Sequence, residues 1–166
     1  MTMVIADPAQ QTCPAWCQRH NPPQNAEDSY RHYSDEPPFP LTDDPGHPLT
    51  IYRCLYARPD GTCHHTIEIV QALAGHPNSC KGFGVSASEA RRLAHAITVL
   101  TATPGPDQPI SLSSTQDTPL NIRRQKVYSF DWDFTIEVHQ GSDYIALTPA
   151  EAPKLAHQLH LLADTL

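Results

Sequence analysis

The residues with the clearest chemistry lie near the N-terminus, in the run CPAWCQRH. Cys13, Cys17 and His20 place two thiols and an imidazole close together, and thiolate sulfur and imidazole nitrogen are ligands that bind Zn²⁺ tetrahedrally. His32 would complete a Cys2His2 set, and His47 is the alternative for the fourth position. The spacing predicts a structural zinc site. The other interpretation is a Pro-rich tail whose thiols bind nothing.

A second group of candidate ligands lies on a predicted β-hairpin. The runs IYRCLYA and TCHHTIEIVQ have strand-like composition, and residues 58–61 between them have turn chemistry. A four-residue turn would place Cys54 opposite His65 and diagonal to Cys63. Cys80, in a predicted loop, could reach them and complete a second metal site. The alternative is that Cys54 and Cys63 are small apolar residues of the core.

The rest of the chain carries no motif for nucleophilic or phosphate chemistry. It lacks the G-x-S-x-G elbow, the P-loop, the dinucleotide fingerprint and the C-x-x-C redox pair. Asp131, Asp133 and Glu137 alternate along a strand-like run, and we interpret them as a solvated face rather than a cation site. We therefore expect no catalytic residue and no enzymatic activity.

Two similar segments form the body that must position these residues. TIEIVQ at 66–71 resembles TIEVHQ at 135–140, and SASEARRLAHAITVL at 86–100 resembles TPAEAPKLAHQLHLL at 148–162. Because strand and helix recur in the same order, we infer an internal duplication. Neither copy could bury its apolar face well alone, whereas two copies packed together could.

The periodicity within these segments predicts the fold class. SASEARRLAHAITVL has a capping-box pair, Ser86 and Glu89, followed by an apolar stripe at helical spacing. The run YSFDWDFTIEVH at 128–139 alternates apolar and polar residues, as in a strand with one buried face. We therefore predict an α+β fold, an antiparallel sheet with two helices on its apolar face.

Composition divides the chain at about residue 48. Residues 1–48 are rich in Pro, Asp, Asn and Gln without periodicity, and are predicted to form a small, irregular, zinc-binding head. Residues 49–103 are predicted to form a β-β-β-α unit and residues 127–166 a β-β-α unit, joined by a linker at 104–126. Together, residues 49–166 are expected to form one packed domain.

Net charge and hydropathy limit the partners and the location. With 11 basic and 18 acidic residues the net charge is −7, which repels nucleic acid and anionic membrane surfaces. The chain shows neither a secretory signal nor an apolar run of about 18 residues, so we predict a cytoplasmic protein without membrane contact. A basic group at Arg123, Arg124 and Lys126 is interpreted as a solvated run.

The CPAWC run with its following histidines, and the two (S/T)xxEAxxLA helices, resemble a family of small proteins common in actinobacteria and some of their phages. Members look like a CPxWC…H…H head followed by a strand pair and an LTxxEAxxLAxxL helix. The resemblance covers residues 13–32 and the helical segments 86–100 and 148–162, and leaves out the cysteine-bearing hairpin. It implies a host group and a metal-binding head, and it lends no activity.

The predicted function is a non-enzymatic, zinc-stabilised module whose head presents a fixed surface to a protein partner. A first alternative is a zinc-dependent regulator that contacts nucleic acid through the head and the basic group at Arg123, Arg124 and Lys126. A second is a metal-dependent hydrolase, in which His32 or His47 does not bind and a zinc position stays open for water.

Overall fold

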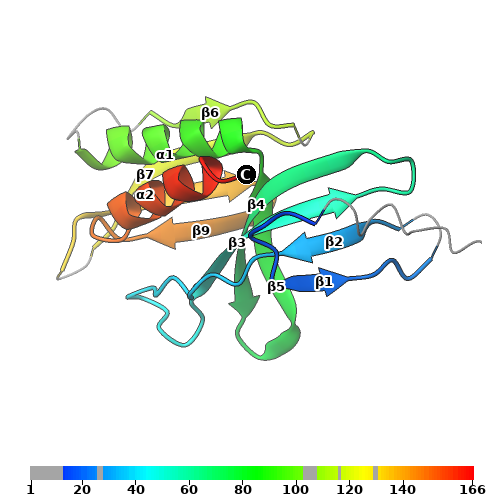
Figure 1. The fold of residues 1–166 in the computed structure, drawn as a ribbon. Coiled ribbons are helices and arrows are strands. Elements are labelled where there is room, and N and C mark those ends of the chain that lie inside the picture. The colour runs from blue at the N-terminus through cyan, green and yellow to red at the C-terminus, as the bar shows by residue number, and fades with distance from the viewer. Residues whose placement is uncertain (1–12, 26–27, 103–107, 116, 129–130) are drawn as a thin grey trace, which may run out of the picture.

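The computed structural model describes residues 13–25, 28–102, 108–115, 117–128 and 131–166. Within these ranges the strands form two antiparallel sheets, and two helices pack beside each other against them (Figure 1). The first sheet has the order β1 (Arg19–Asn21), β2 (Tyr30–Tyr33), β3 (Leu49–Ala57), β4 (Cys63–Leu73), β5 (His76–Val85). The predicted α+β class is confirmed, with its strands divided between two sheets instead of one.

The second sheet and both helices complete the fold. The sheet has the order β6 (Ile110–Leu112), β7 (Leu120–Lys126), β8 (Phe134–Gln140), β9 (Asp143–Leu147). The helices are α1 (Ala87–Ala102) and α2 (Ala152–Ala163). Strands β5 and β9 lie beside each other where the two sheets meet. No helix in the described ranges has both the length and the apolar character needed to cross a bilayer.

The two units have the same element order, β3-β4-β5-α1 and β7-β8-β9-α2. Leu49 pairs with Gln71 in the first unit, and Leu120 pairs with Gln140 in the second. Each glutamine Nε2 donates to a backbone oxygen two residues before its paired leucine, at 2.9 Å in the first unit and 3.0 Å in the second. Equivalent pairs with equivalent hydrogen bonds agree with the inferred duplication.

The second unit is larger than the sequence pattern indicated. The segment 104–126, predicted as a linker, contains β6 and β7. With β7 this unit has the three strands before its helix that the first unit has, and β6 is an additional strand. The pattern concealed β7 because only the beginning of LNIRRQK alternates between apolar and polar residues.

The strand predicted over 128–139 is shorter in the structure, because β8 begins at Phe134. The Val127 amide donates to the Asp133 carbonyl at 3.0 Å, which closes the connection from β7. Tyr128, expected on the apolar face, is 99% exposed. The alternation of apolar and polar residues therefore extends beyond β8 into the connection that precedes it, where it does not indicate a strand.

Tight turns end the middle strand of each unit. Gly75 and Gly141 have φ values of 73° and 61°, which glycine adopts without steric cost. They allow two-residue connections, because Leu73 pairs with His76 and Gln140 pairs with Asp143. The loop predicted to hold Cys80 is therefore mostly strand β5.

One hydrophobic core is shared by the two units. Its fully buried side chains come from both sheets and both helices: Leu49, Ile51, Ile67, Ile69, Leu93, Ile97, Leu120, Ile122, Ile136, Ile145, Leu147, Leu155 and Leu159. Among the described residues this cluster begins at Phe39, so strands β1 and β2 contribute nothing to it. Another interaction must hold those two strands.

A buried glutamate organises the start of α1. The Ser86 amide donates to Glu89 Oε2 at 2.7 Å, and the Glu89 amide donates to Ser86 Oγ at 3.3 Å. This reciprocal pair is the predicted capping box. The Thr115 amide also donates to the Glu89 carboxylate, from the segment that leads into β7. Glu89 therefore joins the first unit to the beginning of the second.

A second buried glutamate does the same at the start of α2, and it contacts the segment that enters the first unit. The Thr148 amide donates to Glu151 Oε2 at 2.8 Å, and the Glu151 amide donates to Thr148 Oγ1 at 3.3 Å. The Thr42 amide, from the segment that leads into β3, donates to the Glu151 carboxylate. Each unit thus binds the segment that leads into the other unit. These reciprocal contacts help to join both units in one domain.

Replacing either glutamate with glutamine is expected to lower the free energy of unfolding by about 2 kcal/mol at neutral pH, because buried amides lose a charged acceptor. Burial by itself raises the pKa of Glu89 and of Glu151, and the backbone hydrogen bonds outweigh it, so both pKa values lie below the ordinary value. A lowered pKa gives stability that is present above the ordinary value of about 4.5 and is lost as pH falls through the folded-state pKa.

Urea unfolding between pH 3 and pH 7 measures this dependence. The wild type should lose stability on acidification, and Glu89→Gln and Glu151→Gln should lose less over the same range. Asp117→Asn, at an exposed position, is the control. Equal pH dependence in the wild type and in both glutamine variants would show that these carboxylates contribute nothing as anions.

Candidate metal centre

The short hairpin of β1 and β2 brings two histidines together. His20 pairs directly with His32, and cross-strand partners project from the same face of a sheet. The centroids of their rings are 4.8 Å apart. Strand β2 also pairs with β3, which fixes the hairpin to the body.

The segment before β1 folds back to add the two cysteines. The Cys17 amide donates to the Pro14 carbonyl at 3.0 Å and closes a turn. Cys13 Sγ lies 3.2 Å from His20 Nε2, and Cys17 Sγ lies 3.5 Å from His32 Nδ1. One ligand atom from each of the four residues lies within 4.8 Å of all the others. The four predicted ligands therefore form one group.

These separations fit a tetrahedral cation. Zinc bonds of about 2.3 Å to sulfur and about 2.0 Å to nitrogen separate neighbouring sulfur and nitrogen ligands by roughly 3.5 Å. Both sulfur–nitrogen contacts, at 3.2 and 3.5 Å, lie near this value. The residues present can hold a zinc ion with small adjustments of their side chains.

The environment of His32 also favours metal binding. The side chain is fully buried, and its Nε2 atom has no hydrogen-bond partner among the described residues. Burial, and secondarily the neighbouring His20, lower the pKa of His32, which favours the neutral imidazole that binds metals.

The Cys17 thiol ionises less readily than an ordinary cysteine. Burial, followed by the adjacent Cys13 side chain, raises the pKa of Cys17. A divalent cation acts in the opposite sense, because it stabilises the thiolate and displaces the proton. Metal affinity at this site should therefore rise with pH.

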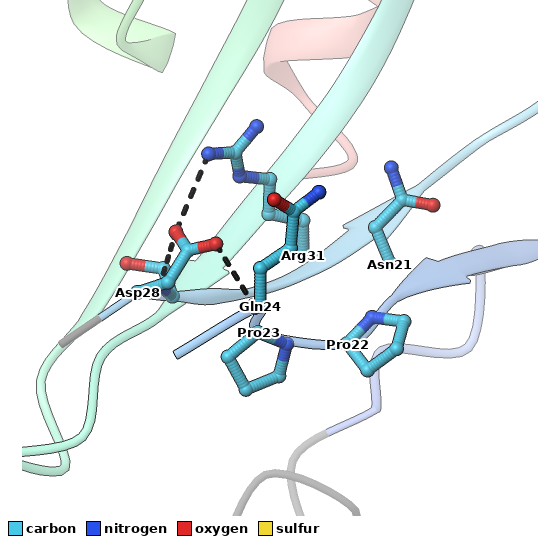
Figure 2. Close-up of a pocket in the computed structure, with 7 residues that line it drawn as sticks. Asn21, Pro22, Pro23, Gln24, Asp28 and Arg31 are labelled. Carbon is cyan, nitrogen blue, oxygen red and sulfur yellow. Dashed lines mark hydrogen bonds and ion pairs between the residues drawn. The ribbon is translucent and has the colours of Figure 1, made fainter. Parts of the chain in front are cut away.

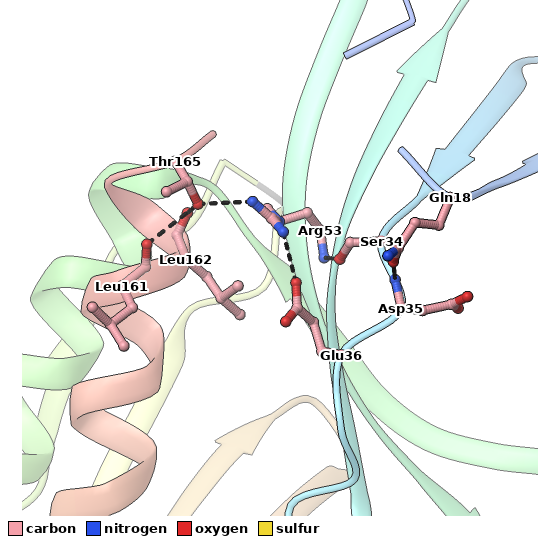
Figure 3. Close-up of polar contacts among 8 residues, drawn as sticks. All are labelled: Gln18, Ser34, Asp35, Glu36, Arg53, Leu161, Leu162 and Thr165. Atoms are coloured by element: carbon pink, nitrogen blue, oxygen red, sulfur yellow. Dashed lines mark hydrogen bonds and ion pairs between the residues drawn. The ribbon is translucent and has the colours of Figure 1, made fainter. Parts of the chain in front are cut away.

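Trp16, between the two cysteines, packs against the body. Its ring meets the His65 ring edge-on at 6.5 Å between centroids, and the Arg53 guanidinium lies 5.2 Å from its centroid. Arg53 also donates to Glu36 at 2.8 Å and to Thr165 Oγ1 at 3.0 Å (Figure 3). One β3 side chain therefore links the cysteine turn to the C-terminal end of the chain, a role that the sequence did not reveal.

The second predicted metal site does not form. Cys54 pairs with Thr66, and His65 pairs with Leu55, so Cys54 and His65 point to opposite faces of the sheet. The turn has five residues, because the Arg58 amide donates to the Thr62 carbonyl at 2.9 Å. The predicted turn had four residues, and a shift of one residue moves every side chain to the other face.

The remaining cysteines of that group are far apart. Cys63 pairs with Ala57 near the tip of the hairpin, whereas Cys80 pairs with Ala72 at the other end of β4. At about 3.3 Å per strand residue, these positions are separated by roughly 30 Å. Cys54 is buried, and burial raises its pKa to about 12. Cys54 is thus a buried thiol, as the alternative interpretation proposed, whereas the same interpretation is wrong for Cys63, which is exposed.

Two other candidates have partners elsewhere. His47, the alternative fourth ligand, lies 2.7 Å from Asp44 through Nδ1 and falls outside the ligand group found among the described residues. Glu137 forms an ion pair with Arg123 at 2.7 Å, and its Oε2 lies 2.9 Å from His139 Nε2. Glu137, which the sequence pattern assigned to a solvated face, is therefore paired with neighbouring side chains.

No protein-family model, curated protein or solved structure matches the chain. The resemblance to the actinobacterial and phage family therefore stays a prediction. The geometry of the site is the basis for the functional argument that follows.

Proposed function

We propose that this protein is a non-enzymatic, zinc-stabilised module that binds a protein partner. The observation that carries the proposal is the convergence of two cysteines and two histidines, whose ligand atoms lie within 4.8 Å of one another. Thiolate and imidazole ligands favour zinc over magnesium or calcium. Four protein ligands fill a tetrahedral zinc and leave no position for water or substrate, which is typical of a structural site.

Zinc at this place would supply stability that the hairpin of β1 and β2 otherwise lacks. Its described residues add nothing to the hydrophobic core. A structural zinc contributes about 10–16 kcal/mol of apparent binding free energy in small peptides, which is enough to order a segment of this size. We propose a cytoplasmic location, because thiols that bind zinc must remain reduced.

The surface proposed for the partner lies in the loop between the two histidine-bearing strands. The described residues of this loop line a pocket of about 460 Å³ (Figure 2). Its lining residues are Asn21, Pro22, Pro23, Gln24, Asp28, Ser29 and Arg31. Proline rings lie on one side, and on the other Asp28 accepts hydrogen bonds from the Gln24 amide and from Arg31 (Figure 2). Because His20 and His32 flank this loop, a bound metal would hold the pocket in one shape.

The structure offers less support for the nucleic-acid alternative. Arg123 is paired with Glu137, and the Arg124 guanidinium lies 3.5 Å from the centroid of the Phe134 ring. Two of the three basic side chains considered for nucleic acid are therefore engaged within the body. The hydrolase alternative requires an open zinc position, which a complete Cys2His2 set does not provide.

Elemental analysis of the full chain, purified under reducing conditions, tests the proposal. The wild type should contain about one zinc ion per chain, and Cys13→Ser and Cys17→Ala should contain almost none. Cys63→Ser and Cys80→Ser are matched controls, since both thiols are exposed and lie outside the ligand group. A metal-free wild type, or full zinc content in Cys17→Ala, would refute the site.

A further inference from the structure

Glu68 and Glu137 occupy the same position in the two units. Both stand third in the similar runs TIEIVQ and TIEVHQ, on the middle strand of their unit. Glu68 pairs with Tyr52 on one side, and Glu137 pairs with Arg123. The duplication therefore supplies an internal comparison between two carboxylates in matched surroundings.

The second unit neutralises its carboxylate with its own side chains. Arg123 Nε donates to Glu137 Oε2 at 2.8 Å, and His139 Nε2 lies 2.9 Å from the same oxygen. Tyr144 stacks on the His139 ring with the centroids 5.1 Å apart. The space in front of Glu137 is thus filled by a cation and an aromatic pair.

The first unit lacks these groups. Tyr52 stands where the second unit has Arg123, and Val70 stands where it has His139. Gly82 stands where it has Tyr144, because Gly82 pairs with Val70 as Tyr144 pairs with His139. The face above Glu68 is consequently free of the bulk that covers the equivalent face of the second unit.

Hydroxyl groups hold the Glu68 carboxylate in place. Thr66 Oγ1 donates to Oε1 at 2.7 Å, and Tyr56 Oη donates to the same oxygen at 3.2 Å. Within the described residues no Lys, Arg or His forms an ion pair with Glu68. Arg31, on the same sheet face, is paired with Asp28 instead. The carboxylate is therefore oriented, and within the described residues it is not neutralised by an ion pair.

A pocket of about 630 Å³ lies in front of this carboxylate. Its lining consists of Ser29, Tyr56, Arg58, Thr62, Cys63, His64, Thr66, Glu68 and Thr115. Glu68 is the only carboxylate among these residues, and hydroxyl groups make up much of the remainder. The pocket suits a polar ligand that carries a positive charge.

We propose that this pocket binds a guanidinium group, with Glu68 as its anion. The chemistry is the one that the second unit supplies internally through Arg123, since guanidinium and carboxylate form strong charge-assisted hydrogen bonds. The net charge of −7 favours the approach of a cation. Arg58 in the lining can face an anionic group of the ligand, so free arginine is the favoured small molecule. An arginine side chain of a protein is the other source.

The proposed guanidinium site and the metal centre use different side chains. Glu68 pairs with Tyr52, whereas His32 pairs with Leu55, and alternate residues of β3 point to opposite faces. The Glu68 and His32 side chains therefore lie on opposite sides of the first sheet. Ser29, which precedes β2, also lines the pocket, so binding is measured on the protein as purified, with the metal ligands intact. Variants of Glu68 and Tyr52 then test this site alone, and variants of Cys13 and Cys17 test the metal centre.

The test is a titration of the full-length protein with L-arginine and with an acetylated Gly-Arg-Gly amide, followed by calorimetry and by NMR shifts. Saturable binding is expected in the wild type. Glu68→Gln should weaken it about tenfold or more, because a charged acceptor is lost. Tyr52→Arg should abolish it, by supplying the cation that the second unit has. Glu137→Gln should bind like the wild type.

Several results would overturn the proposal: no saturable binding of either probe, unchanged affinity in Glu68→Gln, or unchanged affinity in Tyr52→Arg. Circular dichroism establishes that each variant is folded, and Tyr52→Arg keeps Glu68, so the test does not depend on one variant. Tighter binding of arginine than of the peptide would identify a small-molecule ligand. The reverse order would identify a protein side chain.

Discussion

Removing the proposed zinc ion, by chelation or through Cys17→Ala, is expected to release β1 and β2 from the first sheet while the body stays folded. The hydrophobic cluster of the described residues begins at Phe39 and needs no side chain from this hairpin. The loss should be large, because structural zinc contributes about 10–16 kcal/mol in small peptides. Cys54 and Leu55 are buried on β3, next to β2 and outside the main cluster, and should become accessible.

Alkylation of Cys54, followed by peptide mass spectrometry, measures this release. Modification should be slow in the metal-loaded protein and at least about a hundredfold faster after chelation, as expected for a buried thiol with a raised pKa. Cys63 and Cys80 are exposed and should react equally in both states, so they serve as internal controls. Protection of Cys54 that survives complete zinc removal would show that the hairpin is held by something other than metal.

Truncating the equivalent leucines of the two helices is expected to cost about 2–5 kcal/mol each, the usual penalty for a buried Leu→Ala change. Leu93 of α1 and Leu155 of α2 are both fully buried in the shared core. Since the helices pack against each other and the positions are equivalent by duplication, Leu93→Ala and Leu155→Ala should have similar effects.

Denaturant unfolding of the metal-loaded protein gives these free energies. Leu161→Ala is the matched control on α2, since Leu161 is 55% exposed and its truncation should change stability by less than about 0.5 kcal/mol. A cost below about 1 kcal/mol at either buried leucine would show that its helix is peripheral to the core.

The two units are linked by reciprocal hydrogen bonds as well as by the packing of their side chains. Glu89 of the first unit binds the segment entering the second, and Glu151 of the second binds the segment entering the first. If the chain were cleaved between the units, these two contacts would be lost only when the two fragments dissociate. The shared core therefore makes either unit alone an unstable fragment.

The sequence alone determined the features that depend on short-range patterns. Both helices were predicted because apolar stripes and capping pairs such as Ser86 and Glu89 act within a few residues. The ligand group at Cys13, Cys17 and His20 was predicted because most of it lies in one short run. The duplication was visible because two segments repeat residue types in the same order.

Only the tertiary structure decided which residues meet across strands. The five-residue turn after β3 set the register that separates Cys54 from His65, and one residue of turn length is beyond what composition reports. The tertiary structure also places His32, and not His47, in the ligand group, because the pairing of β1 with β2 puts His32 opposite His20. Side chains on neighbouring strands are brought together by register, which local residue preferences do not encode.

The contrast between Glu68 and Glu137 has the same origin. Both belong to nearly identical runs, and their own segments give no sign that they differ. Arg123 reaches Glu137 from β7, whereas Tyr52 occupies the matching place on β3. Whether each carboxylate has a cationic partner is set by the neighbouring strand. The pairing of these strands depends on contacts between segments that are distant in the chain, so it cannot be predicted from the local sequence.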